Sequence, residues 1–169
     1  VLGQIKPKCK TIHAVMKAGA VPRTLAAVLV THSHHDHALD SAIVAHQTDA
    51  TLVGSQSTMR IAEGQLSAED FVALKKEWLP RAGPMDLGGF HIEAIAGPHS
   101  DGPPLIGPLL DGEIAAPLAM PAHVASFKMG DNYAFYLRHP TAEILVLPSA
   151  AVPERVPEMK DCNTKPCVV

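Results

Sequence analysis

Residues 26–37 read AAVLVTHSHHDH, and this stretch decides how the rest of the chain is interpreted. Its first five residues are apolar and are not interrupted by a polar side chain. Such a short apolar run is typical of a strand that is covered on both faces. The second half of the stretch is rich in histidine and contains an aspartate, and both residue types are common metal ligands. The sequence therefore predicts a metal site at the end of a buried strand.

The spacing of these polar residues favours a single shared site. His32 and His34 are two residues apart, so on an extended backbone both imidazoles leave the same side of the strand. Asp36 and His37 follow where the chain is expected to turn into a helix, and they can face the same cleft from another direction. This donor set suits zinc, or iron or manganese if oxygen ligands are added elsewhere. A solvated histidine tract or a tag remnant fits less well, because a tag would not follow an apolar strand.

The pattern His32-Ser33-His34-His35-Asp36-His37 resembles the H-x-H-x-D-H signature of the metallo-β-lactamase superfamily, where it also follows an apolar strand. The resemblance spans roughly residues 26–149. It implies an α/β fold, an αββα sandwich in which helices cover two mixed β-sheets, here divergent or incomplete. Members hydrolyse β-lactams, thioesters, lactones, phosphodiesters and nucleic acids, and some have lost activity. The resemblance thus implies metal chemistry without defining a substrate.

A third ligand is expected at His99. Residues 90–95, FHIEAI, alternate in polarity like a strand with one buried face, and the chain then runs into Gly97-Pro98-His99. By the resemblance, a strand of this kind ends in a glycine-bearing turn whose histidine is the third ligand of the first metal. His99 would then complete the plan of three ligands and one water found in catalytic zinc sites. Asp101 either orients His99 or only forms the turn.

The sequence departs from the superfamily pattern at the second metal. The strand expected over residues 143–147 would there lead into an aspartate that bridges both metals, but this chain has Ser149 at that place. A serine hydroxyl is a weak neutral ligand and lacks the bridging charge. The last histidine of the pattern has no counterpart before Val169. A second ion would be left with Asp36 and His37, so we expect one firm metal and a weak or absent second one.

These residues predict metal-assisted hydrolysis of an ester, lactone, amide or phosphodiester bond in a small-molecule substrate. Zinc lowers the pKa of a bound water from about 15.7 to about 7, which makes hydroxide available at neutral pH. Asp36 is the expected catalytic residue, because its carboxylate would orient that water or accept its proton.

Two alternative functions stay open. One is a metal-binding but catalytically silent domain that associates with another chain or a second copy of itself, since uncovered sheet edges favour pairing. The other is a β-lactamase, which would need a substrate-grasping loop and a lysine or asparagine for the carboxylate of the drug. Neither of these features can be assigned from the sequence.

Composition narrows the class of protein. Of the 169 residues, 47% are hydrophobic and 18% are charged, which excludes a disordered chain and fits a single domain over residues 1–169. The net charge of −3 gives no basic field for a phosphate backbone, so nucleic acid is a poor candidate partner. No apolar run approaches the roughly 20 residues of a membrane helix. No signal peptide is visible after Val1, which predicts a cytoplasmic protein unless a leader has been cleaved.

Periodicity and capping residues predict the remaining elements. Helices are expected over residues 11–20 and 40–46, the latter with Ile43 and Val44 inward, and from Ser55 or Ser57 to Gly64. A further helix after Ser67 would carry Phe71, Leu74 and Trp78 on one face. Strands are expected over residues 51–53, 124–129, 133–138 and 143–147, with Asp131 in a hairpin turn. Residues 97–121 are interpreted as a loop at the rim of the site, residues 1–25 as a divergent N-terminal segment and residues 153–169 as a peripheral tail.

Overall fold

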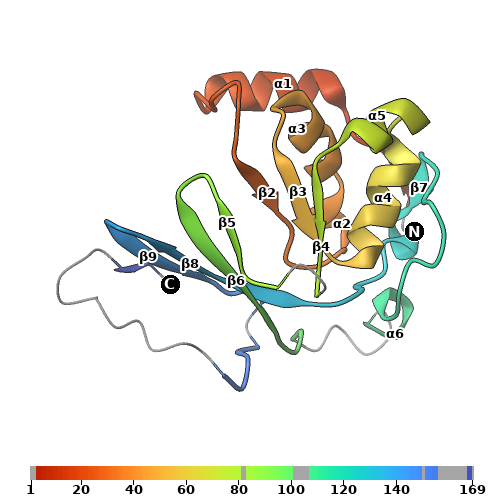
Figure 1. Cartoon of the computed structure of the whole chain (residues 1–169). Helices are drawn as coiled ribbons and strands as arrows, with labels where there is room; N and C mark the ends of the chain where they lie inside the picture. The colour runs from red at the N-terminus through yellow and green to blue at the C-terminus, as the bar shows by residue number, and fades with distance from the viewer. Residues whose placement is uncertain (1–2, 81–82, 101–106, 150, 156–166, 169) are drawn as a thin grey trace.

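The computed structural model describes residues 3–80, 83–100, 107–149, 151–155 and 167–168 (Figure 1). The α-helices are α1 (Cys9–Ala18), α2 (His35–Ala38), α3 (Ser41–Gln47), α4 (Gln56–Gln65), α5 (Ala68–Ala73) and α6 (Gly107–Leu110), and a 3-10 turn covers Val124–Ser126. The strands are β1 (Gln4–Ile5), β2 (Ala27–Leu29), β3 (Thr51–Gly54), β4 (Lys76–Trp78), β5 (Met85–Leu87), β6 (Phe90–Ala96), β7 (Ala122–His123), β8 (Tyr133–His139), β9 (Ala142–Val146) and β10 (Cys167–Val168).

A three-stranded parallel sheet in the order β2-β3-β4 carries the strand that precedes the histidine motif. Helices α2 and α3 connect β2 to β3, which confirms the predicted β-α-β unit. On the central strand β3, Leu52 and Val53 are fully buried and belong to different apolar clusters. Leu52 packs with α3 and α4, and Val53 packs against the second sheet, because successive strand side chains point to opposite faces. This sheet is therefore covered on both faces, as predicted.

The second sheet has the order β10-β9-β8-β6-β5 and lies on the side of the parallel sheet away from α4 (Figure 1). Strands β5, β6, β8 and β9 pair antiparallel, and β10 adds to the edge parallel to β9. Ile92, Tyr133 and Phe135 of this sheet are buried together with Val53 of the first sheet and with Leu79, which follows β4. The result is an incomplete form of the expected α/β sandwich, in which the second sheet is mixed, as predicted, and the first is entirely parallel. The strands predicted over residues 90–95, 133–138 and 143–147 are confirmed.

The hairpin between β5 and β6 shows how local sequence fixes this packing. Gly88 and Gly89 have φ angles of +60° and +84°, which suits a two-residue hairpin turn. A Cβ atom on Gly88 would come within 2.4 Å of the Ala26 side chain. Glycine is therefore required both for the turn and for the close approach of the hairpin to the start of β2.

The predicted helices around the parallel sheet are largely confirmed. α1 covers most of residues 11–20, and α4 begins after Ser55, whose hydroxyl accepts the amide hydrogen of Thr58 at 3.3 Å. In α3 the fully buried side chains are the small Ala42 and Ala45, while Ile43 and Val44 are half-buried. The closest helix–sheet contact is thus made by alanines, which allow the two backbones to approach.

The prediction that Trp78 lies on a helix with Phe71 and Leu74 is wrong. α5 ends at Ala73, and Trp78 lies in β4, paired with Gly54 of β3. The ammonium group of Lys76 donates to the carbonyl groups of Phe71 and Leu74 at 2.7 and 3.0 Å, which satisfies the free end of the helix.

The strand predicted over residues 124–129 is also wrong. The extended residues are those of β7, which pairs with β1 and ends just before this range, and the first three residues of the predicted strand form the 3-10 turn. Asp131 is consequently not in a hairpin turn; it lies in a bend that leads into β8. Phe127, in the middle of this segment, is fully buried in the cluster beneath α3 and α4.

Two predictions fall partly outside the described residues. In the loop predicted over residues 97–121, residues 101–106 are not described, Asp101 among them, and α6 is a single turn. In the tail, residues 156–166 and 169 are not described. Within the part of the chain that the structure covers, no helix has the length and apolar character needed to cross a membrane.

Candidate metal centre

Three histidines meet where β2 and β6 end. His32 follows β2, His34 directly precedes α2, and His99 follows β6. One nitrogen of each ring can be chosen so that all three lie within 4.8 Å of one another, and this is the group of potential metal ligands found among the described residues. The three side chains that the sequence assigned to the first metal are therefore brought together.

The rings face one another closely. Nε2 of His32 lies 3.1 Å from Nδ1 of His34. The ring centroid of His99 is 4.7 Å from that of His32 and 5.0 Å from that of His34, and both pairs meet edge to face. His32 is fully buried, and the other two rings are half-buried. A ligand at this point would be approached by nitrogen atoms from three directions.

Hydrogen bonds around the rings determine which nitrogens are free. Nδ1 of His99 lies 2.7 Å from the carbonyl oxygen of Ser100, so this nitrogen carries the proton and Nε2 has a free lone pair. Nδ1 of His32 lies 3.3 Å from the hydroxyl of Thr31, which leaves its Nε2 facing His34. Ring nitrogens of three histidines therefore converge on one point, which fits a metal ion with imidazole ligands.

The environment keeps the rings of His32 and His34 neutral. Burial first, and then the neighbouring histidines with His37 foremost, lower the pKa of His32 from its ordinary value of 6.5 to about 3, while Asp36 acts in the opposite direction. Burial also lowers the pKa of His34, as does His99, while the carbonyl of Leu110 acts in the opposite direction. Neutral imidazole is the form that binds metals, so protons do not compete for these two nitrogens at neutral pH.

Asp36 and His37 lie beside the three-histidine group but are not members of it. The Asp36 side chain is 64% exposed, and its carboxylate oxygens lie 3.6 Å from Nε2 of His37 and 3.8 Å from Nδ1 of His35. The ring centroid of His37 is 4.0 Å from that of His32, and its Nδ1 lies 3.3 Å from the Thr31 hydroxyl. The predicted roles of Asp36 as a catalytic residue and of both residues as metal ligands stay predictions.

A buried cluster of hydroxyl groups supports the histidine loop, and sequence reasoning missed it. Ser33, between the first two histidines, lies 3.0 Å from the Ser55 hydroxyl and 3.1 Å from the Thr58 hydroxyl, and those two are 3.3 Å apart. All three side chains are about 1% exposed or less. The hydroxyl cluster of Ser33, Ser55 and Thr58 therefore ties the motif to the start of α4. The sequence signal for this cluster was Ser33 itself, a small polar residue just after the buried strand and between two histidines.

Ser149 contacts the loop that carries His99. Its hydroxyl oxygen accepts the backbone N–H of Ser100 at 3.1 Å and that of Ala151 at 3.3 Å. From the sequence, Ser149 is expected to be a weak ligand in place of an aspartate. Its observed hydrogen bonds instead hold the residue that follows His99.

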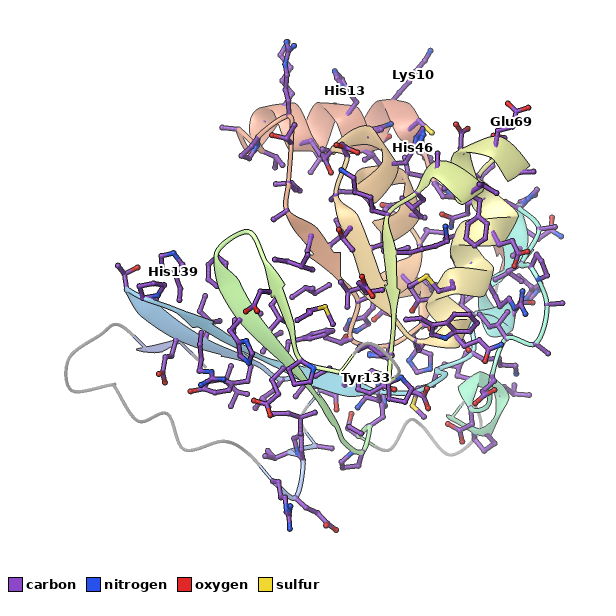
Figure 2. All side chains as sticks on the ribbon, in the orientation of Figure 1. Lys10, His13, His46, Glu69, Tyr133 and His139 are labelled. Carbon is purple, nitrogen blue, oxygen red and sulfur yellow. The ribbon has the colours of Figure 1, made fainter. Side chains whose placement is uncertain are left out.

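His13, His46 and His139 lie away from the three-histidine group. Tyr133 marks the neighbourhood of the group, because its backbone N–H donates to the carbonyl of Thr31 at 2.9 Å. In Figure 2, His13, His46 and His139 are well separated from Tyr133.

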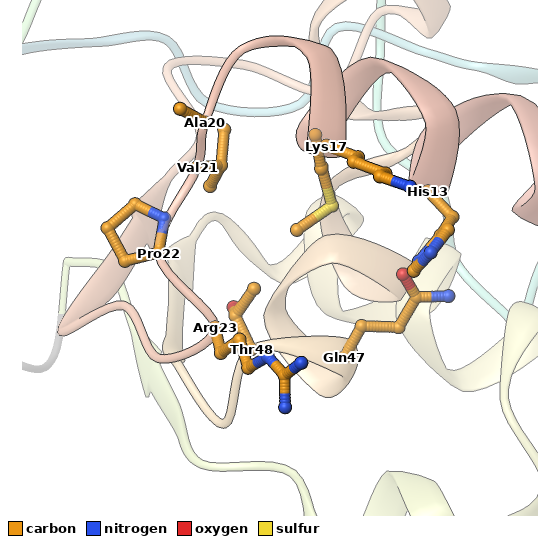
Figure 3. Close-up of a pocket in the computed structure, with 9 residues that line it drawn as sticks. His13, Lys17, Ala20, Val21, Pro22, Arg23, Gln47 and Thr48 are labelled. Atoms are coloured by element: carbon orange, nitrogen blue, oxygen red, sulfur yellow. The ribbon is translucent and has the colours of Figure 1, made fainter.

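The pocket in Figure 3 also lies away from the group. The pocket of Figure 3 has a volume of about 670 Å³ and lies where α1 and α3 end, before β2 begins. Lys17 and Arg23 line it without ion pairs among the described residues. Lys17 lies in the last turn of α1, where a cation interacts favourably with the C-terminal end of the helix. Its presence in the pocket is therefore explained without a bound ligand.

Comparison with known families agrees with this site. Residues 10–126 match the family model described as the metallo-beta-lactamase superfamily, which is more than half of the chain. The matched range includes the three histidines of the group together with Asp36 and His37. No curated protein matches the sequence.

Proposed function

Because the chain belongs to the metallo-β-lactamase superfamily, we propose that it is a metal-dependent hydrolase of a small-molecule substrate that contains an ester, lactone, amide or phosphodiester bond. The observation that carries the proposal is the convergence of His32, His34 and His99 within 4.8 Å at the ends of two strands. Structural zinc sites have four protein ligands, whereas catalytic sites have three and keep one position open. A group of three histidines matches the catalytic plan.

The donor set favours zinc over iron or manganese. Three imidazole nitrogens and no carboxylate make up the group, and manganese in particular prefers oxygen ligands. A bound zinc would supply a Lewis acid and lower the pKa of a water ligand. A second ion would depend on Asp36 and His37, whose geometry supports at most a weak site.

The residues around the group have separate tasks in this proposal. The Thr31 hydroxyl and the Ser100 carbonyl fix the rings of His32 and His99 through their Nδ1 atoms. The exposed carboxylate of Asp36 accepts a proton on one of its oxygens as the bond of the substrate is attacked.

A catalytically silent metal-binding domain is the competing proposal. It is favoured by one observation, the engagement of Ser149 with the Ser100 amide where relatives would have a metal-bridging carboxylate. This alternative predicts zinc binding without turnover. A β-lactamase activity is a special case of the amide arm of the main proposal.

The experiment uses untagged protein loaded with zinc and four chromogenic substrates: an aryl ester, a thiol-releasing lactone, an aryl phosphodiester and a cephalosporin. We expect turnover of at least one class, abolished by chelation and reduced about 10²- to 10⁴-fold in Asp36→Asn with zinc content unchanged. The control is His46→Ala, which removes an exposed histidine of α3 that pairs with Asp70. Zinc binding without turnover of any class would favour the silent domain, and equal activity in Asp36→Asn would remove that residue from the mechanism.

A further inference from the structure

We infer that Asn132 is a positioning residue for the third histidine, His99, a role that rests on the metal site of the proposed function. Asn132 lies directly before β8 and is 5% exposed. It is not a candidate ligand or proton carrier. Its effect on chemistry would come through the loop that carries His99.

The Asn132 side chain binds the two residues that precede His99. Its Nδ2 atom donates to the carbonyl of Gly97 at 3.2 Å and to the carbonyl of Pro98 at 2.8 Å. The backbone carbonyl of Asn132 also accepts the N–H of Gly97 at 3.1 Å. Because carbonyl groups can only accept, these contacts fix which end of the amide faces the loop. Three hydrogen bonds from one residue thus fix the position of the backbone immediately before His99.

The other end of the same amide indicates that stability alone does not account for this residue. Oδ1 of Asn132 is buried and has no hydrogen-bond partner among the residues that the structure describes. A buried acceptor without a partner costs about 1–3 kcal/mol. The cost of the unpaired Oδ1 offsets part of the stabilisation that the two Nδ2 hydrogen bonds to the loop provide.

Asn132 also belongs to the segment that holds the other two histidines. The backbone N–H of Ser33 donates to the carbonyl of Met129 at 2.8 Å, and the N–H of Tyr133 donates to the carbonyl of Thr31 at 2.9 Å. Residues 129–133 therefore bind the loop of His32 and His34 and, through Asn132, the loop of His99. On the opposite side of His99, the Ser149 hydroxyl holds the Ser100 amide. The Asn132 side chain therefore positions the ring nitrogen of His99 relative to those of His32 and His34.

The test exchanges the donor for an acceptor of nearly the same size. In Asn132→Asp a carboxylate oxygen would face the carbonyls of Gly97 and Pro98, and the loop would move away from it. We expect the zinc dissociation constant, measured by competition with a chromophoric chelator, to rise about 10- to 100-fold, as for other residues that orient metal ligands. The visible spectrum of the cobalt-loaded protein should change in shape, which a loss of stability alone would not produce. Asn132→Ala is the second variant if the aspartate prevents folding.

Thr48→Val is the matched control. Thr48 is 1% exposed and its hydroxyl donates to the carbonyl of Val44 at 2.7 Å. It directly follows α3, and its backbone carbonyl accepts the N–H of Leu25, which lies just before β2 and thus at the other end of that strand from the histidines. This variant should lose thermal stability and keep the zinc affinity. If folded Asn132 variants keep wild-type zinc affinity and cobalt spectra, or if Thr48→Val loses affinity equally, the inference is wrong. A wild-type protein that binds no zinc would instead overturn the proposed function.

Discussion

Ser33→Ala tests whether the hydroxyl cluster of Ser33, Ser55 and Thr58 anchors the histidine motif. The substitution removes two hydrogen bonds, of 3.0 and 3.1 Å, from fully buried side chains. Each is worth about 1 kcal/mol. The Ser55 and Thr58 hydroxyls keep their mutual contact at 3.3 Å, so neither is left without a partner. We therefore expect the free energy of unfolding of the metal-free protein to fall by about 2 kcal/mol, or the melting temperature by about 4–8 °C.

Urea unfolding in the presence of a chelator measures this change, and a double-mutant cycle with Thr58→Val isolates the contact. The coupling free energy between Ser33 and Thr58 should be about 1 kcal/mol. The control is Ser41→Ala, a buried serine with a single hydrogen bond to the Ala38 carbonyl at 2.8 Å, which should cost about 1 kcal/mol. Repeating the series in saturating zinc should show a smaller stabilisation by zinc in Ser33→Ala, because the motif loop is less well held. A loss below about 0.5 kcal/mol with no coupling would refute this account of the loop.

Three further changes address other parts of the site. Gly130→Ala should cost about 2 kcal/mol in urea unfolding, because Gly130 has a φ of +63° and a Cβ there would lie 2.8 Å from the Ser57 side chain; an unchanged midpoint would contradict this. Burial, and then Asp131, raise the pKa of Tyr133, so above pH 10 the unfolded chain loses a proton that the folded chain keeps. Stability should fall with rising pH there by up to about 1.4 kcal/mol per pH unit, with a shallower fall in Tyr133→Phe, and equal slopes would count against it. His37→Ala should keep the zinc of the three-histidine group, and a zinc-free variant by elemental analysis would show that His37 is a required ligand.

Much of the candidate site could be predicted because its chemistry lies in contiguous sequence. The apolar run before His32 defines a strand, and the alternation over residues 90–95 defines another, so the positions of His34 and His99 at strand ends follow from local patterns. Their meeting in space came from the resemblance to a family. The buried partners Ser33 and Asn132 carry no such pattern, since a single serine or asparagine is more often a turn or surface residue.

The errors of fold prediction have a common physical origin. Phe71, Leu74 and Trp78 are spaced like one face of a helix, but a short helix followed by a strand produces the same spacing. What selects the strand is the parallel pairing of Trp78 with Gly54, a contact between segments 24 residues apart. The two-residue pairing of β1 with β7 is more distant still, and it ends at His123, before the 3-10 turn that stands where a strand was expected from Val124 onward. Long-range pairings of so few residues leave no periodic signal.

The three-histidine centre is tested most directly by the zinc content of untagged protein purified without added metal, compared with His99→Ala and His91→Ala. His91 is a matched control because it lies on β6 and pairs with Asp86 at 2.9 Å, outside the group. We predict about one zinc per chain in the wild type and in His91→Ala, and a sharp loss in His99→Ala. A wild-type protein nearly free of metal, or a His99→Ala variant that keeps its zinc, would contradict the assignment of His32, His34 and His99 as one metal site.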